Sequence, residues 1–245
     1  MDLQDLPIFV ILAILAEVIG TIGGFGSSVF FVPMASYFMA FKTVLGLTAL
    51  FHLSSNFSKI VLFRKGFDKN LVLYLGIPAV FFVIAGSLLS RYVKGEILNL
   101  ALGIFLILFS LLFLIKKDLE ISPTKKNAFA GGVFSGFIAG LLGTGGAIRG
   151  ATLSAYNLKK DKFIATSAII DMGVDLSRSV VYTTSGYIGW SELYLVPILF
   201  LVGVAGTYIG KRLLVGISQQ LFKKIVLLLL FGIGVSTLVL ASARY

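Results

Sequence analysis

The sequence predicts an all-α polytopic membrane protein made of two inverted-topology repeats, each with about five hydrophobic segments. Composition is the first reason. Of the 245 residues, 58% are hydrophobic and 13% are charged, whereas a soluble domain carries roughly 25% charged residues. The mean hydropathy is +1.00. The second reason is a run of apolar segments along the chain. The third is a glycine cluster that interrupts apolar sequence twice, near Gly23 and again near Gly143.

Apolar segments account for most of the chain. In the first half they cover 7–22, 27–41, 44–63, 71–91 and 97–115, and in the second half 128–142, 147–158, 162–184, 192–213 and 221–243. A helix needs about 20 residues to cross a hydrocarbon core of about 30 Å, and several of these segments reach that length. The segments that flank each glycine cluster are shorter. We therefore expect glycine-interrupted, re-entrant or half-spanning helices whose tips meet near the membrane midplane.

A hydrophilic break divides the chain into two halves. Residues 116–127 contain Ser122-Pro123 and several lysines, a composition typical of a linker. We interpret 1–115 as the first repeat, 116–127 as a cytoplasmic linker and 128–245 as the second repeat. Local similarity supports this division, because Asn56-Phe-Ser-Lys59 matches Asp175-Leu-Ser-Arg178 at a constant offset.

The loop charges favour inverted repeats. If the chain changes sides at every segment, fourteen lysines and arginines fall on one face and four on the other. The richer face holds Arg64, Lys65, Lys69, Lys116, Lys117, Lys125, Lys126, Lys159, Lys160, Lys162, Lys211, Arg212, Lys223 and Lys224; the poorer face holds Lys42, Arg91, Lys94 and Arg244. Positive charge accumulates in cytoplasmic loops. We therefore expect a multi-pass protein of the cytoplasmic membrane with both termini outside. This bias does not separate two full crossings from a re-entrant hairpin.

The two glycine clusters predict a site for a small anion. Each cluster releases the backbone from helical geometry, and a new helix begins directly after it. A helix start carries unpaired N–H groups and a partial positive charge, which suit an oxyanion. The predicted binding residues are Gly23, Gly24, Gly26, Ser27, Ser28, Gly143, Thr144, Gly145, Gly146 and Arg149. The alternative is that the glycines only allow close helix packing, the interpretation we favour for Gly206 and Gly210.

Arg149 is the most informative member of this set. It follows Gly145 by four residues and therefore lies in the first turn of the second short helix. A cation there opposes the helix dipole, so local stability does not explain it. A bound anion would, because the guanidinium fork matches sulfonate, sulfite or carboxylate oxygens. The alternative places Arg149 at the membrane surface, with its head group among lipid head groups.

Ionisable residues also share one face of a long segment in each half. In the second half they lie at i, i+4 and i+7, so they project from the same side of a helix. The members of this predicted coupling or charge-balancing group are His52, Asn56, Lys59, Asp171, Asp175 and Arg178. Ionisable groups inside a membrane are costly and usually functional. Two interpretations stay open: a proton relay beside the anion site, or a neutralised pair of Arg178 with Asp175 or Asp171.

Two single residues leave alternatives open. His52 is the side chain best suited to proton coupling, but it could equally be a hydrogen-bonded core histidine. Glu17 lies in the middle of the first apolar segment, and its counterpart in the second half is Phe137. It could be a protonatable gate or a neutral, hydrogen-bonded acid.

Several function classes are disfavoured. The sequence has no GxxxxGK[ST] motif, so ATP-driven transport by this chain alone is not expected. One histidine and no cysteine argue against zinc or haem, so we expect neither a metal nor another cofactor. The net charge of +10 is explained by cytoplasmic loops rather than by nucleic-acid binding. We expect a transporter and not an enzyme.

The order of these motifs resembles the sulfite exporter TauE/SafE family. The resemblance rests on the duplicated glycine-rich segment, on Gly-Thr-Gly-Gly-Ala-Ile-Arg-Gly-Ala at 143–151, on Ala165-Thr-Ser-Ala168, and on Asp175-Leu-Ser-Arg178 ahead of Tyr182. The family implies a secondary transporter, without a prosthetic group, of sulfite, sulfoacetate and other organosulfonates, mostly outward. By resemblance the glycine clusters, Arg149, Thr166-Ser167, Asp175 and Arg178 would serve transport.

This chain departs from the family pattern at two positions. Ala147 stands near the place where many members have proline, and Phe25 occupies the position that Gly145 has in the second cluster. The pocket is therefore not expected to be fully symmetric, and the identity of the anion stays open.

Taken together, the sequence predicts a secondary transporter that moves a small sulfur-containing anion outward across the cytoplasmic membrane, with proton coupling as a further hypothesis. Its expected partners are the anion and the lipid bilayer, with a homo-oligomer left open. The alternatives are a passive anion channel, an intramembrane enzyme and a membrane scaffold.

Overall fold

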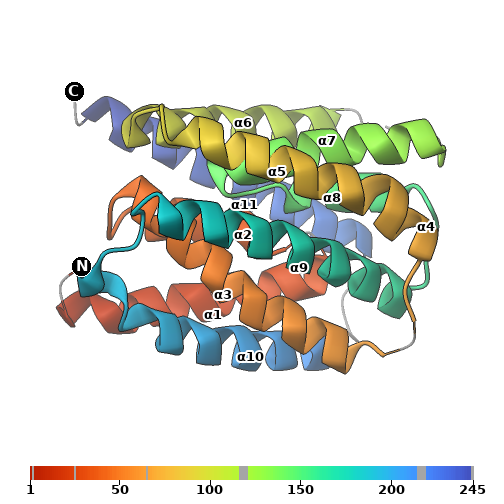
Figure 1. The fold of residues 1–245 in the computed structure, drawn as a ribbon, viewed down its shortest axis with the longest axis horizontal. Helices are drawn as coiled ribbons and strands as arrows, with labels where there is room; N and C mark the ends of the chain where they lie inside the picture. Colours follow the sequence, from red (N-terminus) through yellow and green to blue (C-terminus); the bar gives the residue numbers. More distant parts are fainter. Residues whose placement is uncertain (2, 25, 65, 116–120, 214–218, 244–245) are drawn as a thin grey trace.

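The computed structural model describes residues 1, 3–24, 26–64, 66–115, 121–213 and 219–243. Within these ranges the chain forms helices and loops and no β-strand (Figure 1). The first half contains η1 (Leu3–Asp5), α1 (Leu6–Gly23), α2 (Ser28–Ala35), α3 (Phe41–Leu62), α4 (Lys69–Leu71), the π-helical η2 (Val72–Gly76), α5 (Ile77–Ser90) and α6 (Gly95–Ile115). The second half contains α7 (Lys125–Leu142), α8 (Gly146–Ser154), α9 (Lys160–Thr184), η3 (Trp190–Glu192), α10 (Leu195–Leu213) and α11 (Gln219–Ala243).

The all-helical prediction is confirmed, and each of the ten apolar segments contains a helix. The largest differences are in the two short helices. α2 ends at Ala35 rather than at 41, and α8 ends at Ser154 rather than at 158. At the end of α2 the Ser36 hydroxyl donates to the carbonyl of Val32 at 2.7 Å, so a side chain takes up an acceptor of the last turn. These helices are therefore shorter than hydropathy alone predicted.

The second half begins with a capped helix. The Thr124 side chain accepts the N–H of Asn127 at 3.2 Å, as an N-cap residue does. α7 therefore begins at Lys125, three residues ahead of the apolar segment expected at 128. Residues 116–120 of the predicted linker lie outside the described residues.

Four of the described helical stretches are long and apolar enough to cross a membrane: α1, the stretch 69–90, α6 and α10. α3 and α9 are 22 and 25 residues long, which gives about 33 and 38 Å at about 1.5 Å per residue, but both carry many polar side chains. Large apolar side chains such as Phe81, Leu108 and Leu201 are exposed on the outside of the molecule. These features describe a multi-pass membrane protein.

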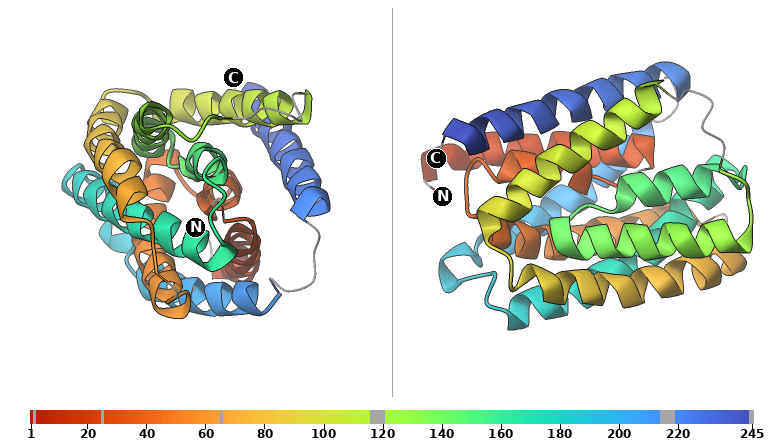
Figure 2. Two further views of the ribbon diagram at one scale, coloured as in Figure 1. Left: turned by 90° about the vertical axis from the view of Figure 1, so that its right-hand side faces the viewer. Right: turned by 90° about the horizontal axis from the view of Figure 1, so that it is seen from above.

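Helices from the two halves pair with each other. The most extensive pairings are α5 with α7, α1 with α10, α3 with α9, and α6 with α11. Figures 1 and 2 show α6 and α11 together at one edge of the molecule. α3 and α9 run antiparallel, because Asn56 meets Asp175 while Asp68, just beyond α3, meets Lys162 near the start of α9.

The loop after α3 is fastened to α9 by Asp68. Its carboxylate accepts the N–H of Leu71 at 3.1 Å and a hydrogen bond from Lys162 Nζ at 3.0 Å, and its own N–H donates to Thr166 Oγ1 at 2.9 Å. The Lys162 hydrogen bond holds the pKa of Asp68 below its ordinary value. Thr166, one of the residues that the resemblance carried over, therefore serves this loop.

Glycines set the closest helix approaches. Gly132, Gly136 and Gly140 follow one another at every fourth position of α7. A Cβ at Gly132 would collide with a backbone carbonyl of η2, and a Cβ at either of the other two glycines would collide with a backbone carbonyl of α5. Gly206 and Gly210 of α10 face Glu17 and Thr21 of α1 in a similar way. Small residues at such spacing let membrane helices approach closely, which is the role we expected for Gly206 and Gly210.

A bulky side chain on the glycine stripe of α7 should separate it from α5. Gly136→Leu is expected to lower the free energy of unfolding by about 3 kcal/mol, the upper range for overpacking, because the Cβ would meet the backbone at Ala79. The control is Gly232→Leu in α11, where nothing lies within 4 Å of a built Cβ. Thermal unfolding in detergent measures both. Equal stability of the two variants would contradict the packing.

Candidate functional site

Both predicted helix breaks occur. α1 ends at Gly23, and Gly24 follows with a φ of 68°; α7 ends at Leu142, and Gly143 follows with a φ of 79°. Both φ values lie in the left-handed region, which glycine adopts without a steric cost. The next helices begin at Ser28 and Gly146. Phe25, which lies between α1 and α2 in the sequence, is outside the described residues.

The two tips lie against each other. The Ser28 hydroxyl donates to Thr144 Oγ1 at 3.5 Å, and a Cβ built on Gly26 would lie 4.0 Å from Gly146 Cα. A small cavity of about 10 Å³ lies beside them, which is room for about one water molecule. Its lining residues are Gly26, Ser27, Ser28, His52, Asn56, Lys59, Ala139, Gly145, Gly146, Arg149, Asp171, Val174, Asp175 and Arg178.

Not every predicted tip residue reaches this cavity. Gly23, Gly24 and Gly143 lie at the ends of α1 and α7 and do not line it. Gly24 faces the ring of Phe163, and Gly143 faces Leu45. These three glycines therefore shape the turns, whereas Gly26, Gly145 and Gly146 face the cavity.

Arg149 lies at the centre of the site and is 2% exposed. Its guanidinium forms a bidentate pair with Asp171, with Nη1–Oδ1 and Nη2–Oδ2 both at 2.5 Å, and Nε donates to Ser167 Oγ at 3.1 Å. The alternative of an arginine at the membrane surface is therefore wrong. The Asp171 carboxylate therefore occupies the face of the Arg149 guanidinium where we expected a bound anion. Its negative charge also offsets the unfavourable position of the Arg149 cation at a helix start.

Asp175 belongs to a second ion pair on the same helix. Arg178 approaches its Oδ1 with Nη2 at 2.6 Å and Nε at 2.7 Å. From α3, Asn56 Nδ2 donates to Oδ2 at 2.7 Å, and His52 Nδ1 lies 3.7 Å from that oxygen. The polar faces predicted on α3 and α9 therefore meet, and Arg178 pairs with Asp175 and not with Asp171.

Arg178 also fastens the broken end of α7. Its Nη1 donates to the carbonyls of Gly143 at 2.8 Å and Ala139 at 3.3 Å, and Tyr182 Oη donates to Gly140 O at 2.6 Å. The last carbonyls of a helix lack helical partners, and a cation there favours the dipole. Arg178 thus holds the second tip in place in addition to neutralising Asp175.

Glu17 is a site residue that the sequence left undecided. It is fully buried and forms an ion pair with Lys59 Nζ at 2.8 Å. The hydroxyls of Thr207 and Thr21 donate to Oε1 at 3.0 and 3.1 Å, and the Ser27 hydroxyl donates to Oε2. The sequence indicated a functional role only through the position of this acid in the middle of an apolar segment. It did not predict Lys59 as the partner of Glu17, because the two residues lie far apart in the sequence and meet only in the folded chain.

His52 lies between the Lys59–Glu17 and Arg178–Asp175 ion pairs. Its Nε2 lies 2.9 Å from Ser27 Oγ. With the Ser27 proton assigned to Glu17, Nε2 is assigned a proton and donates to Ser27. Nδ1 then faces Asp175. We call the resulting series of contacts the polar chain: Lys59, Glu17, Ser27, His52, Asp175 and Arg178.

The charges around the cavity balance. The cations are Lys59, Arg149 and Arg178, and the carboxylates are Glu17, Asp171 and Asp175. With all six ionised and His52 neutral, three positive and three negative charges cancel. Within the part of the chain that the structure describes, no group of three or more His, Cys, Asp or Glu side chains could hold a metal ion.

Comparison with known proteins identifies the chain's relatives. A search of curated proteins finds no match. A family model described as sulfite exporter TauE/SafE matches residues 9–237, which includes both glycine tips and every member of the polar chain. The chain therefore belongs to the sulfite exporter TauE/SafE family, and this membership implies a membrane transporter of sulfite or a related anion.

Proposed function

We propose that this protein is a secondary transporter that exports sulfite or a small organosulfonate across the cytoplasmic membrane together with a proton. The observation that carries the proposal is the buried Arg149, held by Asp171 beside the facing starts of α2 and α8. Interrupted helices whose starts face an anion are a recurring arrangement in transporters.

The anion binds by replacing Asp171 on Arg149. The cavity of about 10 Å³ is too small for a sulfur oxyanion next to the existing pair, because it has room for about one water molecule. A sulfonate presents oxygens to the guanidinium fork much as a carboxylate does. The N–H groups at the starts of α2 and α8 and the hydroxyls of Ser28 and Thr144 complete the site.

Charge balance supports proton coupling. The site is neutral before binding, so an added monoanion leaves one uncompensated negative charge in an apolar surrounding, which is costly. Protonation of one carboxylate restores neutrality. We assign this proton to Asp175, which is faced by His52 and Asn56 from α3 and by Arg178 on its own helix, with Asp171 and Arg149 close by. Once Asp175 is neutral, Arg178 balances the charge of the displaced Asp171, which lines the same cavity. Delivery of this proton by His52 is part of the proposal: the ring first takes up a proton on Nδ1, which makes it a cation, and then passes that proton to Asp175 Oδ2, 3.7 Å away.

The halves 1–115 and 128–245, joined by the linker 116–127, act as inverted repeats. Three features support this. First, α3 and α9 are antiparallel. Second, α1 corresponds to α7 and α5 to α10, and the first half's α1 packs on the second half's α10 just as the second half's α7 packs on the first half's α5. Third, the glycine after α1 faces Phe163 near the start of α9, and the glycine after α7 faces Leu45 near the start of α3. In this arrangement the site opens to alternate sides as one half moves against the other.

Loss of the Arg149 charge should weaken anion binding. The sharp variant is Arg149→Gln combined with Asp171→Asn, because it leaves no buried charge unpaired. Thermal stabilisation by sulfite, methanesulfonate, sulfoacetate and acetate is the measurement, with exposed Arg91→Ala as the control. We expect an affinity loss of about 10- to 100-fold, the range for a hydrogen bond to a charged group. Undiminished stabilisation of the double variant would place the anion elsewhere.

Removal of the Asp175 charge should uncouple transport from protons. In proteoliposomes, Asp175→Asn is expected to abolish accumulation driven by a pH gradient and to leave counterflow exchange intact, since exchange needs no net proton movement. Exposed Glu96→Gln is the matched control.

Normal pH-driven accumulation in Asp175→Asn would remove Asp175 from the relay. Absence of concentrative transport in the wild-type protein under every ion gradient would indicate a passive channel.

The orientation of the chain can be tested by labelling single cysteines. The sequence has no cysteine, so labelling has no background. Tyr92→Cys, at a position that is 84% exposed between α5 and α6, should react with an impermeant maleimide in intact cells. Lys126→Cys near the start of α7 should react only after permeabilisation. The reverse pattern would invert the topology.

A further inference from the structure

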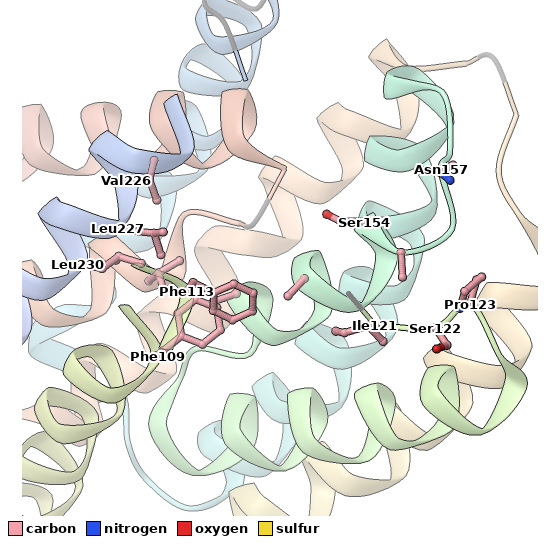
Figure 3. Close-up of a pocket in the computed structure, with 14 residues that line it drawn as sticks. Phe109, Phe113, Ile121, Ser122, Pro123, Ser154, Asn157, Val226, Leu227 and Leu230 are labelled. Carbon is pink, nitrogen blue, oxygen red and sulfur yellow. The ribbon is translucent and has the colours of Figure 1, made fainter. Parts of the chain in front are cut away.

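A second and much larger cavity lies between the short helices and the α6–α11 pair (Figure 3). Its volume is about 470 Å³, within the usual range for small-molecule pockets. The fourteen lining residues are Val29, Phe109, Phe113, Ile121, Ser122, Pro123, Ala147, Ala151, Ser154, Ala155, Asn157, Val226, Leu227 and Leu230.

The cavity is apolar along most of its wall. Figure 3 shows aromatic and aliphatic side chains of α6 and α11, among them Phe109 and Leu230, at one end. The polar side chains of the lining are Ser122 in the loop before α7, Ser154 at the end of α8 and Asn157 in the loop after α8. Such a surface accommodates hydrocarbon and offers hydrogen bonds near one end.

The cavity adjoins the anion site through two short helices. Val29 follows Ser28, and Ala147 follows Gly146; in each pair the first residue lines the small cavity and the second lines the large one. The first turns of α2 and α8 therefore separate the two cavities.

Positive charge surrounds the same end of the molecule. Lys125 follows Pro123 by two residues, Lys159 follows Asn157 by two, and Lys224 precedes Val226 by two; all three lysines are exposed. Lys125 Nζ lies 4.7 Å from the centre of the Tyr74 ring. Exposed cations beside the cavity attract anions to this side of the protein.

We propose that this cavity is a vestibule for the hydrocarbon body of an organic sulfonate whose head binds beside Arg149. The proposal rests on the function proposed above and names its substrate class: sulfonates with a body of several carbons bind more tightly than sulfite or methanesulfonate. The vestibule belongs to the lysine-rich side, from which such an anion would be exported.

The test uses alkanesulfonates of one, three and six carbons with the full-length protein in nanodiscs. Wild-type affinity should rise by about fourfold for each buried methylene group. Ala151→Leu and, from the opposite wall, Val226→Phe each fill the cavity. Each should reduce hexanesulfonate affinity at least tenfold and leave methanesulfonate affinity within about twofold. Ala85→Leu on the exposed side of α5 is the matched control and should change neither.

Two results would overturn the vestibule while the anion site stands: affinity that does not depend on chain length, or a chain-length effect that survives both filling variants. Copurified lipid that native mass spectrometry detects in the wild type and not in Ala151→Leu, with no chain-length effect, would assign the cavity to an acyl chain instead. Binding of sulfite without binding of any of the three sulfonates would overturn the vestibule alone. Absence of binding by sulfite and by all three sulfonates would refute the proposed function itself, and the vestibule with it.

Discussion

The cost of isolated charge in an apolar interior governs the centre of this protein. Three cations, three carboxylates and one histidine lie within a bundle that exposes many large apolar side chains. Each of the six charged groups has an oppositely charged partner within hydrogen-bond distance. Removal of one member of a pair would leave its partner as an uncompensated buried charge, which costs more stability than replacing both members by apolar residues. The antiparallel packing of α3 and α9 follows from this requirement, because it brings Asn56 and His52 to Asp175.

The glycine breaks serve the same requirement from the backbone side. Each break ends a long helix inside the bundle, where carbonyl groups would otherwise lack donors. Arg178 and Tyr182 supply donors to the end of α7. Each break is also followed by a short helix whose start lines the small cavity. Backbone and side chains therefore contribute to one polar interior, and the close glycine contacts between α5 and α7 hold the surrounding wall at the distance that this interior needs.

The sequence was sufficient for features that depend on local pattern. Hydropathy and glycine spacing predicted helices in all ten segments and breaks at both clusters, and helical periodicity placed Asp171, Asp175 and Arg178 on one face. Pairings between distant segments were not predictable. Arg149 with Asp171, and Lys59 with Glu17, depend on which rotamers and helix rotations the bundle adopts. The lengths of α2 and α8 were overestimated, because hydropathy does not register where a serine side chain ends a helix.

The two halves differ in how each holds its broken helix. At matching positions of α3 and α9, Lys59 grips the Glu17 carboxylate of α1, whereas Arg178 grips backbone carbonyls of α7. An ionic latch and a set of neutral acceptors do not release with equal ease, and Phe137 offers no counterpart to Glu17. The two broken helices are therefore held with unequal strength, and the two halves of this protein are not energetically equivalent.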